Sequence, residues 1–420
     1  MNISSKNLNA QHFIDLEEKY GAHNYHPLPV VLEKGEGVFV WDVEGKRYYD
    51  FLSAYSAVNQ GHCHPRIINA LKKQAEKLTL TSRAFYNNML GELEEFLCNL
   101  FGFDKALMMN SGVEAVETAM KLCRKWAYQV KGLPENSAKI VFAKDNFHGR
   151  TLSVISASND STATTNFGPF LEGIVQVPYN DIKAFENLLK SDPHIAGFIV
   201  EPIQGEAGII VPSEDYLQQV RALCTQYNVL FIADEIQTGI ARTGSMLASY
   251  DINDKDSKSK PDVIILGKAL SGGVLPVSAV LANDEVMLTI KPGEHGSTYG
   301  GNPLACAVAL EAVKTVIDED LANRAEEMGE LFRAGLNDIA KRCKLITTVR
   351  GKGLLTAIVI DAAEDDDTAW NICLAFKENG LLAKPTHGNK IRLAPPLVIT
   401  KEQIEECLHI IEKSLVNFAS

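Results

Sequence analysis

Three apolar segments, each followed by a charged residue, constrain the fold more than any other feature of this chain. They are residues 195–200 before Glu201, residues 229–233 before Asp234 and residues 263–267 before Lys268. Near-continuous apolar strands, separated by helical patterns, are typical of a parallel sheet with helices on both faces. We therefore predict an α/β fold. In such a fold ligands collect at the carboxyl ends of the strands, where these charged residues lie.

The length of 420 residues is enough for more than one lobe. The alternation of strands and helices predicts a large, mainly parallel-sheet domain over residues 55–305. From about residue 306 the pattern changes to helices mixed with short strands. We expect residues 1–54 and 306–420 to form a smaller α+β domain.

Charge and hydropathy exclude several classes of partner. The formal net charge is −12, which argues against a surface for nucleic acid or an anionic membrane. No apolar run reaches the roughly 18 residues that a membrane span needs. We expect neither nucleic acid nor a membrane as a partner.

The cysteines and the N-terminal segment bear on location. The eight cysteines are scattered without CxxC spacing, which is typical of reduced, mostly buried thiols. Residues 1–10 are polar with one lysine, so they lack the apolar core of a signal peptide and the arginines of a transit peptide. These observations lead us to expect a cytoplasmic location.

Lys268 stands where a buried strand ends in a turn (Gly267-Lys268-Ala269-Leu270-Ser271). A lysine is rarely buried without a partner, so it is either held in an ion pair or used in chemistry. Burial would lower its pKa and free the amine as a nucleophile for a Schiff base. On this segment alone the structural role is the commoner one.

A second feature is the turn between the strand predicted at residues 105–109 and the helix that follows it. Ser111 and Glu114 fit a capping box, and Gly112 and Val113 would form the first turn of the helix. Free backbone N–H groups at a helix N-terminus favour a phosphate. The alternative is a plain capped helix.

His62-Cys63-His64 places three possible zinc ligands side by side. Zinc would need a second ligand pair at a fitting spacing, and the sequence offers none. Pro65 and the helical pattern after it favour a loop and a helix start, so we expect no metal.

The strand-end groups together fit one ligand. The anion cradle at Gly112, the carboxylate of Asp234 and the amine of Lys268 match a phosphate, a protonatable ring nitrogen and an aldehyde. Pyridoxal 5′-phosphate carries all three. Phe147, just past another predicted strand, would cover the face of its ring.

The chain resembles the class III, fold-type I aminotransferases over nearly its full length. Residues 232–239 (IADEIQTG) and 267–273 (GKALSGG) match the family's central signature. Within the class, residues 20–29, 55–62 and 201–206 most resemble the enzymes that act on L-ornithine.

The resemblance implies roles for the cofactor residues. Lys268 would carry the cofactor and then move the proton, and Asp234 would pair with the pyridine nitrogen. The other residues implied to touch the cofactor are Gln237 at the phenolic oxygen, Phe147 on the ring, and Gly112 and Val113 at the phosphate. Ser297 and Thr298 would reach the phosphate of the cofactor that is bound to the partner subunit, which implies a homodimer with shared sites.

The resemblance also implies how substrates are told apart. Arg150 and Tyr25 would bind the α-carboxylate of ornithine, and Tyr55 would line the same pocket. Arg392 would bind the α-carboxylate of glutamate, because a guanidinium fork suits a carboxylate. Glu206 would pair with Arg392 during the ornithine half of the reaction; the alternative for Glu206 is an ordinary loop carboxylate.

The implied reaction is a ping-pong transfer of the δ-amino group of L-ornithine to 2-oxoglutarate. It gives L-glutamate and L-glutamate 5-semialdehyde, which cyclises to pyrroline-5-carboxylate, and it belongs to the conversion of arginine and ornithine to proline. One rival is an acetylornithine, 4-aminobutyrate or other ω-amino acid aminotransferase with the same cofactor residues. Another is a binding or regulatory protein that keeps the fold without turnover, against which Lys268, Asp234 and Arg392 argue.

Overall fold

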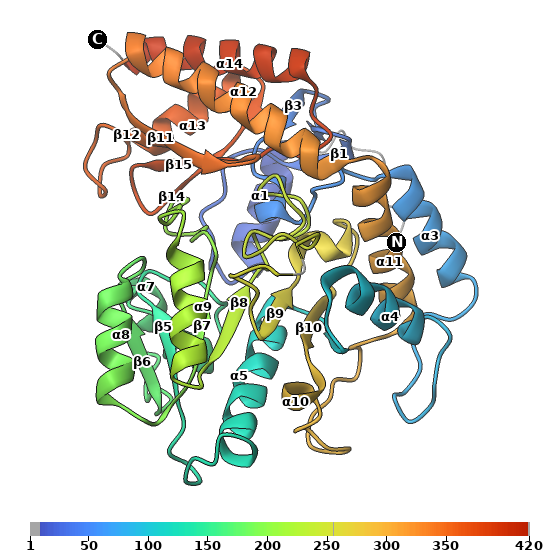
Figure 1. Cartoon of the computed structure of the whole chain (residues 1–420). Coiled ribbons are helices and arrows are strands. Elements are labelled where there is room, and N and C mark those ends of the chain that lie inside the picture. Colours follow the sequence, from blue (N-terminus) through green and yellow to red (C-terminus); the bar gives the residue numbers. More distant parts are fainter. Residues whose placement is uncertain (1–8, 255, 419–420) are drawn as a thin grey trace.

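A seven-stranded sheet forms the centre of the computed structural model, which describes residues 9–254 and 256–418 (Figure 1). Its strands lie in the order β4-β10-β9-β8-β7-β5-β6. They are β4 (Lys105–Met109), β5 (Lys139–Ala143), β6 (Ile174–Val177), β7 (Ile195–Val200), β8 (Leu230–Asp234), β9 (Val263–Leu266) and β10 (Ser278–Ala282). The five neighbouring strands β6, β5, β7, β8 and β9 are parallel, which confirms a mainly parallel sheet.

Strand β10 is the exception, since it runs antiparallel to both of its neighbours, β4 and β9. The sequence pattern does not predict this strand. Its residues (SAVLA) are mostly small, and only the short 3₁₀ helix η1 (Lys268–Ser271) lies between it and β9. It is nevertheless buried throughout, because it lies between two other strands.

Both faces of the sheet are covered, as the apolar strands predict. Along β8, Phe231 and Ala233 belong to one core cluster and Ile232 to another, so alternate side chains enter different cores. Helix α5 (Gly112–Gln129) packs over β9 and β10 on the side of Ile232. Helices α4 (Leu90–Phe101), α8 (Ile182–Ser191) and α9 (Tyr216–Gln226) contribute to the other core.

Two smaller sheets lie with the C-terminal helices above the central sheet in Figure 1. One has the order β1-β2-β3-β13 and joins both ends of the chain: β1 (Leu32–Glu36), β2 (Phe39–Asp42), β3 (Arg47–Asp50) and β13 (Leu381–Leu382). The other is antiparallel: β11 (Ile346–Lys352), β12 (Leu355–Ile360), β15 (Lys390–Leu393) and β14 (Lys384–Thr386). Strands β2 and β3 pair antiparallel as a hairpin. The domain boundaries at residues 54/55 and 305/306 stay a prediction.

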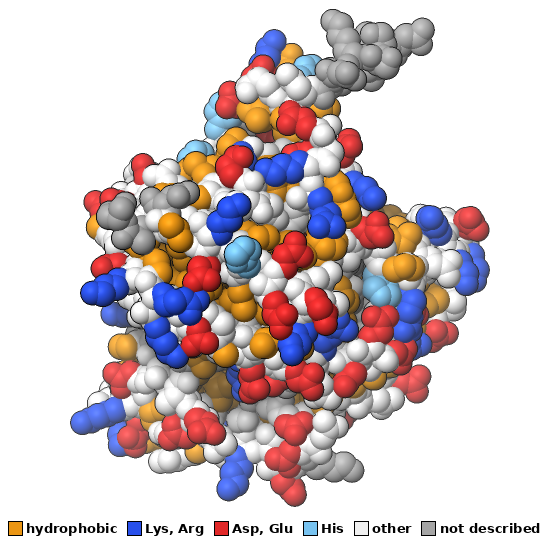
Figure 2. Space-filling view, turned by 90° about the horizontal axis from the view of Figure 1, so that it is seen from above, with side chains coloured by type: hydrophobic (Ala, Val, Ile, Leu, Met, Phe, Trp, Pro, Cys, Tyr) orange, Lys and Arg blue, Asp and Glu red, His pale blue; other side chains and the backbone are white. Residues whose placement is uncertain are grey.

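The remaining helices connect these sheets. They are α1 (Ala10–Tyr20), α2 (Ser53–Ser56), α3 (Pro65–Ala75), α6 (Leu152–Ile155), α7 (Ser161–Thr164), η1 (Lys268–Ser271), α10 (Asp284–Met287), α11 (Pro303–Asp318), α12 (Leu321–Arg342), α13 (Thr368–Glu378), α14 (Lys401–Leu415) and η2 (Val416–Phe418). Across the described residues, none of the helices is both long and apolar enough to span a bilayer. On the face seen in Figure 2, basic and acidic side chains alternate over the surface.

One buried arginine ties the loop after β8 to the C-terminal sheet. Arg242 is fully buried, and its Nε and Nη2 donate to Asn59 Oδ1 at 3.1 and 2.6 Å. Its Nη1 donates to the carbonyl oxygens of Leu354 and Pro395 at 3.1 and 2.6 Å. The segment that carries Asp234 and Gln237 is thereby anchored to the sheet that carries Arg392.

Candidate active site

The charged residues of three neighbouring strands meet at one edge of the central sheet. Asp234 is the last residue of β8, Glu201 follows β7 directly, and Lys268 lies two residues after β9. A cavity of about 260 Å³ opens at this edge. It is lined by Gly112, Val113, Phe147, His148, Gly149, Glu201, Ile203, Asp234, Ile236, Gln237, Thr238 and Lys268. The predicted cofactor residues of a single chain are therefore brought together.

Lys268 has the chemistry of a free amine. No hydrogen bond or ion pair to its side chain is found among the described residues, so a structural ion pair is not what the structure shows. Burial lowers the pKa of Lys268; Glu206 and Asp234 oppose this and Arg392 adds to it, with a net downward direction. Its backbone φ of 41° lies in the left-handed region, a strain that is common at functional sites.

Asp234 is held from two sides. Its Oδ1 accepts the Ile236 N–H at 3.0 Å, and its Oδ2 accepts from His148 Nδ1 at 2.6 Å. Both side chains are buried. Each carboxyl oxygen has one donor and keeps a further acceptor position for the N–H of a protonated ring.

Glu201 is a third buried acidic or basic group beside this pair. Its two carboxyl oxygens accept the backbone N–H groups of Phe147 at 3.1 Å and Gly205 at 3.3 Å. Burial raises the pKa of Glu201 to about 7; His148 opposes the rise, and Asp234 adds to it. The carboxyl group thus links the ends of β5 and β7 behind the cavity.

The start of α5 has the form of an anion cradle. Ser111 Oγ accepts the Glu114 N–H at 3.3 Å, and Glu114 Oε2 accepts the Ser111 N–H at 2.7 Å, which confirms the capping box. The N–H groups of Gly112 and Val113 belong to the first helical turn and have no partner within the helix. A Cβ at Gly112 would lie 3.0 Å from Ile236 Cδ1, so the backbone passes closely over the cavity wall. Cradle, carboxylate and amine together fit pyridoxal phosphate.

Arg392, on β15, enters the same site from the C-terminal sheet. Its Nη1 donates to Glu206 Oε1 at 2.6 Å, and Gln237 Nε2 donates to the same oxygen at 3.1 Å. Burial alone would raise the pKa of Glu206, but the charge of Arg392 reverses this and the net direction is downward. The Nε of Arg392 is buried without a partner among the described residues. This guanidinium is both paired and incompletely satisfied, as expected of a carboxylate receptor that is masked.

Tyr55 covers the guanidinium of Arg392, with 4.6 Å between the guanidinium carbon and the ring centroid. It is presented by four consecutive residues of positive φ, 53–56, of which none is glycine. Such a left-handed turn is strained and persists only where its surroundings impose it. Tyr25 is 71% exposed, and its charge contributes to the raised pKa of Tyr55, of which burial is the main cause.

Arg150 lies in a wider cavity of about 820 Å³, which Phe147 and Glu206 also line. Its guanidinium carbon is 5.3 Å from the centroid of the Phe147 ring. Arg150 is exposed, so its guanidinium is accessible to a ligand carboxylate from this side.

Ser297 and Thr298 are not brought to the cavity of Lys268 in the same chain. They line a separate hollow of about 600 Å³, together with residues 80–83 and Gly296. Ser297 Oγ accepts from Asn110 Nδ2 at 2.8 Å, so this hollow lies just behind the turn before α5.

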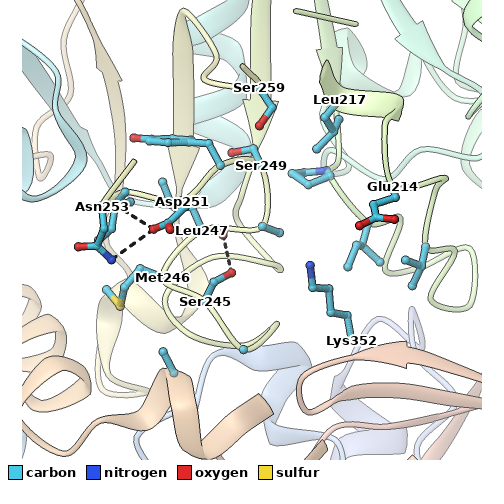
Figure 3. A pocket seen from close by; sticks show the side chains of 18 of the residues that line it. Glu214, Leu217, Ser245, Met246, Leu247, Ser249, Asp251, Asn253, Ser259 and Lys352 are labelled. Atoms are coloured by element: carbon cyan, nitrogen blue, oxygen red, sulfur yellow. Dashed lines mark hydrogen bonds between the residues drawn. The ribbon is translucent and has the colours of Figure 1, made fainter. Parts of the chain in front are cut away.

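A larger cavity, of about 1010 Å³, is lined by none of the predicted site residues (Figure 3). It lies between residues 244–253, the start of α9 and Lys352. Several polar groups there already bond within their own loop, as Ser245 Oγ does to the Leu247 carbonyl at 2.6 Å and Asn253 to Asp251. The size of a cavity does not identify the reactive centre here.

Three residues of the site have no role in the sequence-based predictions. His148 is adjacent to Phe147, but nothing in its own pattern indicates a partner. Glu201 is expected at a strand end beside Asp234 and Lys268, but its pattern alone assigns it no role. Buried Arg242 carries no sequence signal at all, because its partners are a side chain and two carbonyl groups from distant segments.

Comparison with known proteins places these residues in a family. The model of the family described as aminotransferase class-III matches residues 20–415. The chain is 61% identical over 402 residues to a Drosophila melanogaster protein named ornithine aminotransferase, mitochondrial, with 96% of this chain and 90% of that protein covered.

Solved structures give the same picture. The ornithine aminotransferase of Toxoplasma gondii, described with partial occupancy of PLP at its active site, matches with a TM-score of 0.94 and 47% identity over 98% of this chain and 95% of that chain. A protein from Elizabethkingia anophelis named acetylornithine aminotransferase matches with a TM-score of 0.88 and 60% identity over 98% of this chain and 100% of that chain.

The expected cytoplasmic location is wrong. The similar proteins from fruit fly, rat and nematode are named as mitochondrial, which points away from the cytoplasm. All eight cysteines are free, as predicted, but a free thiol indicates a reducing environment and does not say which compartment provides it. Of residues 1–10, on which the expectation of no transit peptide rested, residues 1–8 lie outside the described part of the chain.

The raised pKa of Glu201 predicts how stability depends on pH. The folded chain holds a proton on Glu201 between its ordinary value of 4.5 and about 7, where the unfolded chain does not. The free energy of unfolding should therefore fall by roughly 2–3 kcal/mol as pH rises through that window. In Glu201→Gln, denaturant unfolding of the cofactor-free chain at pH 5 and pH 8 should lack this fall. An equal fall in both chains would contradict the assignment.

Proposed function

The chain belongs to the class-III aminotransferase family, and from that premise we propose that it transfers the δ-amino group of L-ornithine to 2-oxoglutarate. The products are L-glutamate and L-glutamate 5-semialdehyde, which cyclises to pyrroline-5-carboxylate without the enzyme. Both the Drosophila and the Toxoplasma proteins described above are named for ornithine. A role in the conversion of ornithine to proline stays a prediction.

One observation carries the choice of substrate, namely the buried pair of Glu206 and Arg392. Free Arg392 would bind the α-carboxylate of an amino acid and so present its α-amine to Lys268. With Glu206 on its Nη1 at 2.6 Å, that receptor is occupied. An amino acid must then bind its carboxylate elsewhere, and an amine at the far end of its side chain reaches Lys268.

Arg150 and Tyr25 are the proposed receptor for the ornithine α-carboxylate. Arg150 shares the wide cavity with Glu206, so a carboxylate on its guanidinium stays near the masked Arg392. Tyr55 contributes an apolar ring beside them. In the second half-reaction Glu206 moves away, and Arg392 binds the α-carboxylate of 2-oxoglutarate through its fork of donors.

When bound, pyridoxal phosphate supplies an aldehyde for the amine and a ring that accepts electrons from the carbon that loses a proton. Gly112 and Val113 would hold the phosphate with backbone N–H groups, and Phe147 would cover the ring. Asp234 would accept the N–H of a protonated ring nitrogen, and Gln237 would donate toward the phenolic oxygen. Lys268 Nζ removes the proton from Cδ of ornithine, for which its lowered pKa suits it.

We also propose a homodimer in which Ser297 and Thr298 complete the partner's phosphate site. The support is that both residues lie in an open hollow away from Lys268 of their own chain. Exposed Phe85, Tyr86 and Tyr299 lie on the segments around that hollow, an apolar surface that suits burial against a second copy. We further propose that residues 55–305 form one domain and that residues 1–54 and 306–420 form a second, smaller domain.

Half-reactions followed by absorbance test the function. The loaded enzyme should be yellow, lose that absorbance with L-ornithine and recover it with 2-oxoglutarate. Faster bleaching by N-acetylornithine or 4-aminobutyrate would instead establish the activity of a related ω-amino acid aminotransferase. N-acetylornithine is the more important comparison, because the Elizabethkingia protein is named for it. No response to any amine would favour a protein without turnover.

The Glu206→Ala variant tests the masking of Arg392. Removal of the carboxylate should leave Arg392 free, so the ratio of kcat/KM for ornithine to that for glutamate as amino donors should fall by about tenfold or more. Glu214→Ala, at an exposed carboxylate in the other cavity, is the matched control and should leave the ratio unchanged. An unchanged ratio in Glu206→Ala would overturn the masking mechanism.

A further inference from the structure

Glu206 lies in a tight loop, residues 205–210, that is closed by its own backbone. The N–H groups of Gly208 and Ile209 donate to the Gly205 carbonyl oxygen at 3.1 and 3.2 Å. Ile209 has a φ of 59°, in the left-handed region that a β-branched residue rarely adopts. Such strain persists only where the surroundings impose it. The loop therefore has one defined shape that its neighbours maintain.

The neighbours that hold this loop belong to the C-terminal sheet. Ile209 is fully buried and belongs to a core cluster that includes Leu355 and Ala357 of β12. Gly208 has a φ of 97°, and a Cβ there would lie 2.6 Å from Lys390 Cδ on β15, so only glycine allows this close approach. The loop follows β7 of the central sheet in sequence, but it packs on the sheet that carries its ionic partner.

Two side chains of the same sheet donate to carbonyl oxygens of the loop. Thr386, on β14, donates its hydroxyl to the Glu206 carbonyl oxygen at 2.8 Å. Arg350, on β11, donates its Nε to the Gly208 carbonyl oxygen at 2.7 Å. This is the one hydrogen bond of the Arg350 guanidinium among the described residues, and its Nη2 is buried without a partner there. Arg350 therefore contacts the loop and not an acidic side chain.

We propose that Thr386 and Arg350 are positioning residues for the choice of substrate. They fix the backbone on either side of Ala207, so that Glu206 masks or frees Arg392 by rotation of its side chain alone. The inference rests on the proposed masking of Arg392 by Glu206. It extends that role by assigning the two residues that keep the carboxylate within reach of the guanidinium.

The position of the Glu206 backbone decides how completely Arg392 is masked. The carboxylate must hold Oε1 at 2.6 Å from Arg392 Nη1, and its own side-chain torsions are enough to leave that position. Because the two anchors and Arg392 lie on one sheet, the loop stays beside the guanidinium if this sheet shifts against the central one. A loop that has lost an anchor would populate other positions and leave Arg392 free for an α-carboxylate more often.

Thr386→Val tests the anchor, because valine keeps the shape of threonine but has no hydroxyl. The ratio of kcat/KM for ornithine to that for glutamate as amino donors should fall by about threefold to tenfold, through a rise for glutamate. Amide hydrogen exchange of residues 205–210 in the cofactor-free chain should become faster by a similar factor. Thr386→Ser keeps the hydroxyl and is the matched control, which should restore both readouts.

The Glu206→Ala background shows whether Thr386 acts through the carboxylate. The double variant Glu206→Ala/Thr386→Val should have the same ratio as Glu206→Ala, because no carboxylate is left to position. A further fall in the double variant would overturn the inference. So would an unchanged ratio or unchanged hydrogen exchange in Thr386→Val, or equal changes in the Val and Ser variants.

If Thr386→Val does not fold, Arg350→Met removes the other donor, and Arg350→Lys, which keeps a donor, is its control. The same outcomes then decide. Failure of the proposed function would appear differently, because Glu206→Ala itself would then leave the ratio unchanged. A fall of the ratio in Glu206→Ala with none in Thr386→Val would refute the positioning role alone.

Discussion

The order of the strands in the central sheet is the constraint on which the site depends. Neighbouring strands are roughly 5 Å apart, so residues at the ends of β9, β8, β7 and β5 lie within about 15 Å of one another. Lys268, Asp234, Glu201 and Phe147 are far apart in the chain and meet for this reason alone. The strands are buried on both faces, which makes the edge rigid and the positions of these groups fixed before a ligand binds.

Rigidity at the sheet edge is combined with charges that have little access to water. Asp234 is paired with His148, Glu206 with Arg392, and Arg242 with polar groups only. Buried ion pairs contribute little net stability, but an unpaired buried charge is costly. The two ion pairs are therefore better explained by ligand binding than by stability. Each keeps a charged side chain in place to interact with a group of the ligand. Lys268, which has no partner in the described chain, is the group left to react.

The fold could be predicted because its signals are local. Runs of apolar residues that end in Asp234 or Lys268 predict buried strands and their exits, and Ser111 with Glu114 predicts the start of a helix. Strand β10 could not be predicted, because short runs of small residues carry no periodic signal. The C-terminal sheet was indicated only as a mixture of short strands and helices.

The site was predictable only in part, and the reason is again distance along the chain. Glu206 and Arg392 are separated by 186 residues, so no spacing rule joins them, and their pairing was expected only from the resemblance to a family. The contact of His148 with Asp234 spans 86 residues and has no sequence signal. The left-handed turn at Tyr55 is also invisible in the sequence, since none of its residues is glycine. Location was misjudged because free thiols do not distinguish one reducing compartment from another.

The central claim is that the strand ends deliver one reactive amine, that of Lys268, to the cofactor. Borohydride reduction of the loaded enzyme, followed by proteolysis and mass mapping of the cofactor adduct, tests this most directly. The account predicts a single adduct on Lys268, which is lost when the enzyme is saturated with L-ornithine before reduction. An adduct on another lysine, or none in enzyme that contains the cofactor, would contradict it.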